Sequence, residues 1–206
     1  MRIAEIGFDL CYLLFTVVVG CYFAVRGNAL FSALAFTLGF GDSFHLIPRV
    51  FWQTGKRGTK LRTALGIGKA VTSVTMTVFY VIVYHLFLNA SPVTIPVPVT
   101  VFVYLLAIVR IGLICFPQNR WATGDPAPLW NAVRNFPFCA LGAVVAVLLF
   151  TLPSDMPLSY GGYLIVLSFL FYLPVALGVQ KYPKLGMLMI PKTLTYVAFL
   201  SIGFFI

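Results

Sequence analysis

Acidic residues are scarce in this sequence: five Asp and Glu stand against fourteen Lys and Arg among 206 residues. Charged residues of both signs make up only 9% of the chain, whereas 61% of the residues are hydrophobic. Because soluble domains carry about 25% charged residues, this composition excludes an ordinary soluble domain. The net charge of +9 does not indicate nucleic-acid binding, because a basic face needs a soluble surface that displays it.

Metal ligands are scarce as well. The chain has only two histidines, His45 and His85, and its four cysteines show no metal-ligand spacing. His45 lies near one end of an apolar run, and His85 lies near the opposite end of the next run. Across a hydrocarbon core of about 30 Å the two imidazoles cannot share one ion. We therefore predict no metal site and no cofactor.

Long hydrophobic runs, in contrast, are abundant, and seven of them approach the length of about 20 residues that a bilayer-spanning helix needs. The predicted spans are residues 7–25, 29–48, 63–88, 98–116, 135–152, 158–179 and 186–206. Glu5 and Asp9 stand where a signal peptide requires positive charge and then pure hydrophobicity, so the first run is predicted to be retained. The predicted fold is all-α: a single transmembrane domain over residues 1–206, built as a polytopic membrane helix bundle with seven transmembrane helices.

The distribution of basic residues predicts the orientation. If the N-terminus is cytoplasmic and the spans alternate, every Lys and Arg except Arg26 falls in an inner connection or in the inner part of a span. This is the bias that membrane proteins show. Trp52, Trp121 and Trp130 fall in the two long inner connections, where indole rings favour the headgroup level. We predict a cytoplasmic N-terminus, an outer C-terminus and a multi-pass protein of a bacterial cell (plasma) membrane.

Ionisable residues recur at one depth of the predicted spans. Four of them lie six residues from the inner end of their span, about 9 Å below the interface: Asp42, Lys69, Arg110 and Lys192. His45 lies three residues from that end, and Asp9 and Arg134 lie at the margin of the same layer. Because charges are costly in lipid, the layer predicts an internal cluster. The alternative is that the long Lys and Arg stems reach the interface separately.

Hydroxyl groups extend this layer. Lys69, Ser73, Thr77 and Tyr80 are spaced by four, four and three residues, which places them on one helix face. Such a stripe is typical of a cavity wall, and also of hydroxyl contacts that join membrane helices. The candidate ligand-binding residues are therefore Asp42, His45, Lys69, Ser73, Thr77, Tyr80, Arg110, Tyr172, Lys192 and Tyr196, with Asp9 and Arg134 at the margin.

Several stretches resemble a group of small, uncharacterised seven-helix membrane proteins of Gram-positive bacteria, over nearly the whole chain. These stretches are GDSFHLIPR (41–49), GIGKAVTSVTMTVFY (66–80), FPQNRW (116–121), RNFPF (134–138) and GMLMIPKT (186–193). The resemblance implies the fold and no activity.

Residues 41–49 alone also resemble the lysoplasmalogenase family, membrane enzymes that cleave vinyl-ether lysolipids. In that family a Gly-Asp pair ends a span before a Leu-Pro-Arg-like exit, as Gly41, Asp42, Pro48 and Arg49 do here. That family usually has eight spans and a second aspartate in a late helix. The comparable stretch here, SFLFYLPVAL (168–177), contains no acid.

Three functions remain open, and the charge balance ranks them. Cations in the layer match or exceed anions, which favours a protein that binds or translocates a small anionic or amphiphilic ligand through an inward-facing polar pocket. The alternatives are a lysoplasmalogenase-like hydrolase that uses Asp42 and His45 as its acid and base, or a scaffold whose ion pairs fix helix packing. The missing second carboxylate favours binding over hydrolysis. The predicted partners are membrane lipids and such a ligand, and no oligomeric state is predicted.

Overall fold

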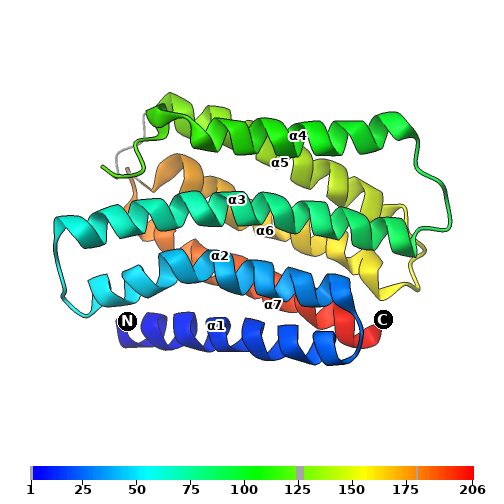
Figure 1. Ribbon diagram of the computed structural model, residues 1–206, viewed down its shortest axis with the longest axis horizontal. Coiled ribbons are helices and arrows are strands. Elements are labelled where there is room, and N and C mark those ends of the chain that lie inside the picture. Colours follow the sequence, from blue (N-terminus) through cyan, green and yellow to red (C-terminus); the bar gives the residue numbers. More distant parts are fainter. Residues whose placement is uncertain (1, 124–127, 180) are drawn as a thin grey trace. The chain divides into compact units, whose positions relative to one another are not determined.

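The computed structural model describes residues 2–123, 128–179 and 181–206 (Figure 1). Its α-helices are α1 (Arg2–Val25), α2 (Ala29–Gln53), α3 (Thr59–Ala90), α4 (Val97–Cys115), α5 (Pro128–Phe150), α6 (Tyr160–Gly178) and α7 (Met189–Ile202). Short 3-10 turns, η1 (Pro117–Asn119), η2 (Pro157–Ser159), η3 (Pro183–Leu188) and η4 (Gly203–Phe205), lie at helix ends. Within these ranges there is no strand, and seven helical segments are long and apolar enough to cross a membrane. The all-α prediction with seven spans is confirmed.

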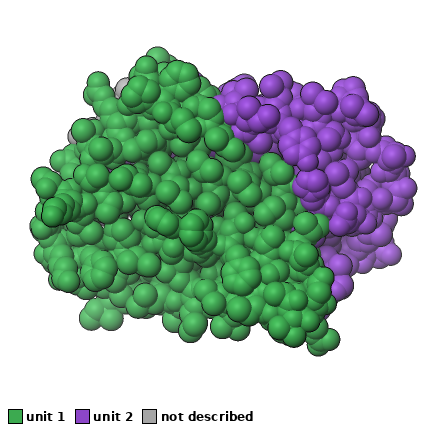
Figure 2. All heavy atoms as spheres, in the orientation of Figure 1, with its two compact units in different colours: residues 1–82, 111–130 green, residues 83–110, 131–206 purple. Residues whose placement is uncertain are grey.

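The chain divides into two compact units, which Figure 2 distinguishes by colour. Unit 1 comprises residues 1–82 and 111–130, and unit 2 comprises residues 83–110 and 131–206. The boundaries fall inside α3, α4 and α5, so these three helices continue from one unit into the other.

Unit 1 begins with an antiparallel hairpin of α1 and α2. Gly27 turns the chain with a φ of +75°, a conformation that a residue without Cβ adopts readily. Asn28 then caps α2, because its side-chain oxygen accepts a hydrogen bond from the Phe31 amide at 3.3 Å. Farther along, the two helices approach so closely that a Cβ on Gly39 would lie 2.3 Å from Thr16 Oγ1. Small residues therefore set the α1–α2 spacing.

The rest of unit 1 packs on the same principle. A Cβ on Gly68 of α3 would lie 2.1 Å from the Phe44 carbonyl of α2, and a Cβ on Gly66 would lie 1.6 Å from the Trp121 carbonyl. Asn119, fully buried after α4, donates to the Leu113 carbonyl at 2.7 Å and so satisfies the end of that helix. Glycines thus bring α2 and the segment after α4 onto α3.

Unit 2 contains residues 131–206 together with residues 83–110, which comprise the end of α3, the connection to α4 and most of α4. The hydroxyls of Tyr84 in α3 and Thr100 in α4 lie 2.7 Å apart and join these two helices. Gly161 of α6 lies against Phe199 of α7, whose ring would meet an added Cβ at 2.6 Å. Close approach at this glycine therefore joins α6 to α7, as small residues do in membrane bundles.

Helix boundaries differ from the predicted ones mainly at polar ends. The second span was expected to end at residue 48, but α2 passes through Pro48 and ends at Gln53. A proline removes one helical N–H, yet this helix continues because Arg49 and Gln53 both bind Glu5 of α1. The fifth span was expected to begin at residue 135, whereas α5 begins at Pro128. Hydropathy finds the apolar centre of a helix and misses its polar turns.

Candidate functional site

The predicted site residues belong to both units, so their surroundings are described unit by unit. Unit 1 contains Asp9, Asp42, His45, Lys69, Ser73, Thr77 and Tyr80. Unit 2 contains Arg110, Arg134, Tyr172, Lys192 and Tyr196.

Polar side chains of α1 and α2 form a ladder, here called the α1–α2 seam. It consists of Glu5, Asp9 and Tyr12 of α1 with Asp42, Arg49 and Gln53 of α2. Arg49 Nη2 lies 3.2 Å from Glu5 Oε2, and its Nη1 lies 3.9 Å from Asp9 Oδ2. Gln53 donates to Glu5 Oε2 at 2.8 Å, and the Tyr12 hydroxyl donates to Asp42 Oδ2 at 2.8 Å. The seam therefore runs from the helix ends toward the middle of the hairpin.

The inner part of the α1–α2 seam is the more buried part, so a charge there depends more strongly on a partner. The Asp9 side chain is only 5% exposed, whereas Arg49 and Glu5 are 27% and 22% exposed. A carboxylate at that depth needs a cation, and Arg49 supplies it. Glu5, Tyr12 and Gln53 were not among the predicted site residues. The two residues on α1 could have been found, because residues 5, 9 and 12 repeat at helical spacing on one face of that helix.

The stripe on α3 differs from the prediction at its start. Lys69 was expected to be buried, but its side chain is exposed, because a long apolar stem lets the ammonium reach outward. Thr77 and Tyr80 are fully buried. The Ser73 hydroxyl donates to the Lys69 carbonyl at 2.7 Å, and the Thr77 hydroxyl donates to the Ser73 carbonyl at 2.9 Å. Both hydroxyls therefore donate their hydrogen bonds within α3 and not to another helix. His45, half-buried on α2, lies where that helix meets Gly68 of α3.

Four helices of unit 2 contribute to a second group, here called the cation–aromatic cluster: Arg110, Phe138, Tyr172, Lys192 and Tyr196. Arg110 Cζ of α4 lies 3.3 Å from the centroid of the Phe138 ring of α5. The Phe138 and Tyr172 rings meet edge to face, with centroids 5.6 Å apart. Lys192 Nζ of α7 lies 5.3 Å from the Tyr172 ring and 5.0 Å from the Tyr196 ring. Cations thus lie against the outer faces of a group of rings that touch one another edge to face.

Amide groups of α5 surround this cluster. The Tyr172 hydroxyl donates to Asn135 Oδ1 at 2.8 Å, and Asn135 donates to Asn131 Oδ1 at 3.2 Å. Arg134 Nη2 donates to the same oxygen at 2.8 Å, and Asn131 donates to the Ala176 carbonyl of α6. Neither asparagine was among the predicted site residues. Residues 131, 135 and 138 fall on one helix face, and this spacing could have revealed them.

Lys192 is the most isolated cation of the cluster. Its residue is 7% exposed, and Arg110 is 3% exposed. In the part of the chain that the structure describes, Lys192 Nζ lies over the faces of two tyrosines and makes neither a hydrogen bond nor an ion pair. The sole acidic residue in the sequence of unit 2 is Asp155, which follows the end of α5, whereas Arg134 lies near the start of that helix.

Neither a metal centre nor a relative identifies the protein. No three His, Cys, Asp or Glu side chains in the described ranges lie close enough together to hold a metal ion. A comparison with family models, curated proteins and solved structures gives no match.

Proposed function

We propose that this multi-pass membrane protein binds a small anionic or amphiphilic ligand, or carries it across the membrane, through the cation–aromatic cluster of unit 2. The observation that carries the proposal is Lys192, a residue only 7% exposed, whose ammonium lies over two tyrosine rings and has neither a hydrogen bond nor an ion pair among the described residues. Contact with a ring face contributes about 0.5–2 kcal/mol, which is less than a buried charge requires. An anionic group would supply the rest.

The neighbouring residues suit the two parts of such a ligand. The guanidinium groups of Arg110 and Arg134 offer planar sets of donors that match a carboxylate or a phosphate. The rings of Phe138 and Tyr172 offer apolar surface beside them. An anionic head with a short hydrocarbon tail would therefore contact both kinds of surface.

The position of the cluster suggests the side of entry. Arg110 lies near the end of α4 and Arg134 near the start of α5, while Tyr172 lies near the end of α6 and Lys192 near the start of α7. Successive spans alternate in direction, so these four helix ends belong to one end of the unit. In the predicted orientation this end is cytoplasmic, and a ligand would enter from the cytoplasm.

Three probes test the proposal on the purified full-length protein in zwitterionic nanodiscs. Dodecyl phosphate carries both the anion and the tail, inorganic phosphate carries the anion alone, and dodecyltrimethylammonium carries the tail with the opposite charge. We expect dodecyl phosphate to raise the melting temperature and the cationic probe to leave it unchanged. Loss of a charge-assisted contact of about 2 kcal/mol would weaken dodecyl phosphate binding by about 30-fold in Lys192→Ala.

Two further variants complete the test. Lys192→Arg keeps the charge and should retain part of the binding. Lys184→Ala removes an exposed lysine of the same unit and should bind the probe like the wild-type protein. Equal stabilisation of the wild-type protein and a folded Lys192→Ala variant would disprove the proposal.

Hydrolysis of lysolipids is a second candidate, supported by one contact in the α1–α2 seam. The Tyr12 hydroxyl holds the Asp42 carboxylate, and His45 follows Asp42 by three residues on the same helix. An acid and a base at this spacing could protonate a vinyl ether and activate water. Aldehyde release from a lysoplasmalogen by the purified protein, abolished in Asp42→Asn, would support this candidate. No release by the folded wild-type protein would remove it.

A scaffold without ligand is the third candidate. The contacts of Arg49 with Glu5 and Asp9 join two helices and need no ligand to explain them. If none of the three probes stabilised the wild-type protein, this candidate would replace the first.

A further inference from the structure

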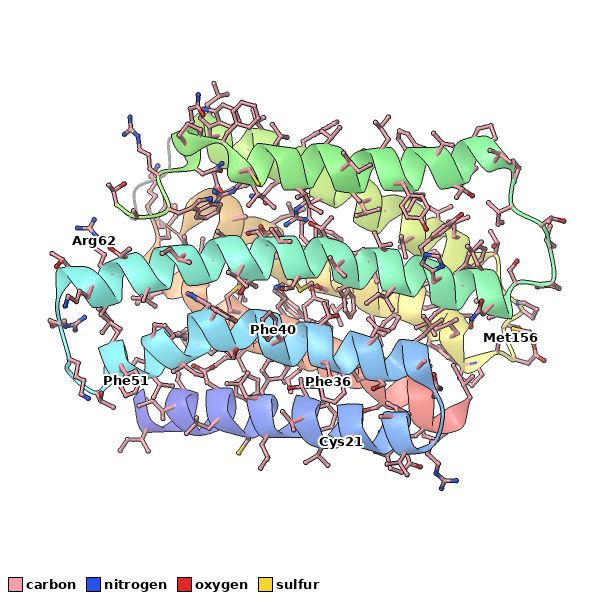
Figure 3. All side chains as sticks on the ribbon, in the orientation of Figure 1. Cys21, Phe36, Phe40, Phe51, Arg62 and Met156 are labelled. Carbon is pink, nitrogen blue, oxygen red and sulfur yellow. The ribbon has the colours of Figure 1, made fainter. Side chains whose placement is uncertain are left out.

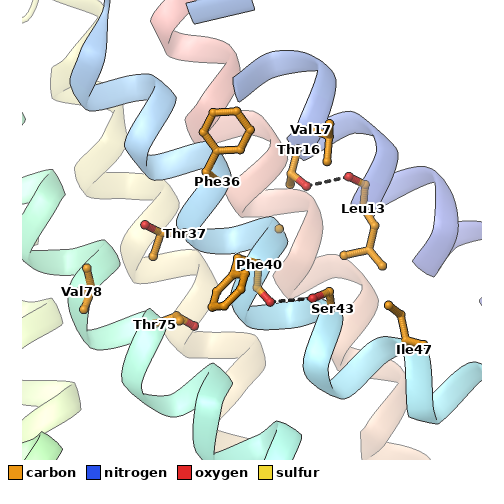
Figure 4. A pocket seen from close by; sticks show the side chains of 11 residues that line it. Leu13, Thr16, Val17, Phe36, Thr37, Phe40, Ser43, Ile47, Thr75 and Val78 are labelled. Atoms are coloured by element: carbon orange, nitrogen blue, oxygen red, sulfur yellow. Dashed lines mark hydrogen bonds between the residues drawn. The ribbon is translucent and has the colours of Figure 1, made fainter. Parts of the chain in front are cut away.

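An apolar groove runs along unit 1 between α1, α2 and α3, with a volume of about 730 Å³ (Figure 4). Its lining includes Leu13 of α1, Phe36, Phe40 and Ile47 of α2, and Val78 of α3. The three α2 side chains are 41%, 63% and 46% exposed. Because these helices are membrane spans, the exposed faces meet hydrocarbon, and the occupant of the groove must be apolar.

The hydroxyl groups in the groove agree with an apolar occupant. Thr16 donates to the Leu13 carbonyl at 2.8 Å, and Ser43 donates to the Phe40 carbonyl at 2.7 Å. Figure 4 shows both bonds. Each hydroxyl binds a carbonyl of its own helix, so its hydrogen is not directed at a ligand. The groove therefore presents mainly methyl groups and aromatic rings.

The groove side of α2 leads to a basic pocket. Residues 36, 40, 43 and 47 are spaced by four, three and four, and one more step of four reaches Phe51. Phe51 lines a second pocket of about 500 Å³ with Lys56, Arg57 and Lys60. Figure 3 labels Phe36, Phe40 and Phe51 in order along the helix. The apolar side of α2 thus ends at a cationic pocket, which is formed by the connection after α2 and the start of α3.

The dimensions match one leaflet of a bilayer. Phe36 and Ile47 are eleven residues apart, or about 16 Å along a helix. This is close to half of a hydrocarbon core of about 30 Å. Phe51 lies about 6 Å farther along the axis, at the depth where headgroups begin. Trp52, a residue type that favours this depth, stands beside it and stacks on Arg57 at 4.1 Å.

The charge of the basic pocket selects the headgroup. Lys56, Arg57 and Lys60 are exposed, and Lys56 Nζ lies 4.8 Å from the Phe51 ring. The sequence contains no acidic residue between Asp42 and Asp125. Juxtamembrane cations of this kind attract anionic lipids of the cytoplasmic leaflet, by about 1 kcal/mol each.

We infer that unit 1 binds an anionic phospholipid, with one acyl chain in the groove and the phosphate against Lys56, Arg57 and Lys60. The site lies in a different unit from the cation–aromatic cluster and does not depend on the ligand proposed there. It has its own residues and its own test.

The test compares two lipids on the purified full-length protein. The protein is mixed with equal amounts of phosphatidylglycerol and phosphatidylcholine of matched chains, and the retained lipid is measured by native mass spectrometry. The wild-type protein should prefer phosphatidylglycerol by about tenfold or more. In the variant Lys56→Ala/Arg57→Ala/Lys60→Ala the ratio should fall close to one. The control Lys181→Ala/Lys184→Ala removes two exposed lysines of unit 2 and should keep the wild-type ratio.

Two variants test the groove, with circular dichroism as the check on folding. Ser43→Phe places a ring in the groove. If this variant fails to fold, Ile47→Trp is used instead, because it enlarges another side chain that lines the groove. Either variant should reduce the retention of both lipids, because the acyl chain can no longer occupy the groove. An unchanged lipid ratio in the triple variant would overturn the inference. If the wild-type protein proves to be a dimer, its conversion to a monomer in the groove variants without a change in retained lipid would also overturn the inference, because a second copy would then be the occupant.

Discussion

Replacement of Arg49 by methionine is the sharpest test of the α1–α2 seam. Methionine keeps much of the side-chain length and removes the charge that faces Glu5 and Asp9. The contact with Glu5 at 3.2 Å is partly exposed, and pairs of this kind contribute about 0.5 kcal/mol. The contact with Asp9 is different, because that carboxylate is only 5% exposed and would lose its cation.

The expected magnitude follows from these two contacts. Breaking a buried pair costs about 3–5 kcal/mol in soluble proteins, but polar contacts between membrane helices average only about 0.6 kcal/mol. Asp9 is nearly buried, but its carboxylate lies 3.9 Å from Arg49, so we expect the loss of this contact to cost about 1.5 kcal/mol, between these two limits. Together with Glu5, the loss is about 2 kcal/mol, or a change of about 30-fold in the unfolding equilibrium constant.

The assay is unfolding of the detergent-solubilised protein by sodium dodecyl sulfate, followed by circular dichroism. Adding Asp9→Asn to Arg49→Met removes the uncompensated carboxylate and should restore about 1 kcal/mol. Arg57→Met, outside the seam, serves as the matched control. The reasoning fails if Arg49→Met lies within about 0.5 kcal/mol of the wild-type protein, or if the double variant recovers nothing.

Three further predictions follow from other contacts. Gly68→Ala places a Cβ 2.1 Å from the Phe44 carbonyl and should destabilise unit 1 by about 2 kcal/mol in the same titration, whereas Gly7→Ala, with open space around it, should be neutral or stabilising. Tyr172→Phe removes the hydrogen bond to Asn135 and should weaken dodecyl phosphate binding about fivefold, measured by thermal shift; wild-type affinity would contradict this. A reporter fused to the C-terminus should be labelled from outside the cell, and a cytoplasmic signal would reverse the predicted orientation.

Hydropathy was sufficient to predict the seven spans, because each apolar run has the length that a bilayer requires. It could not predict how far a helix continues past its apolar part. α2 extends through Pro48 to Gln53 because polar contacts with Glu5 hold its last turn, and those contacts come from another helix. Boundaries of this kind depend on tertiary structure.

The candidate site was predictable as a set of residue types and not as a set of contacts. Depth along a helix pointed to Arg110 and Lys192, and both are buried. Lys69 lies at the same depth and was expected to be buried, but depth gives no information on the direction in which a side chain points, and Lys69 is exposed. The contact between Arg110 and the Phe138 ring could not be predicted, because aromatic residues are common in every span and none of them stands out. Only the packed helices show which ring meets which cation.

The interleaved order of the two units governs how the protein can be made and divided. Unit 1 takes residues 1–82 and is completed by residues 111–130, after unit 2 has already begun at residue 83. A nascent chain that has reached Ile82 therefore lacks the Trp121 carbonyl that packs on Gly66. We therefore expect a fragment that ends at Ile82 to lack part of its own unit, and a genetically split protein to need both pieces of each unit present together.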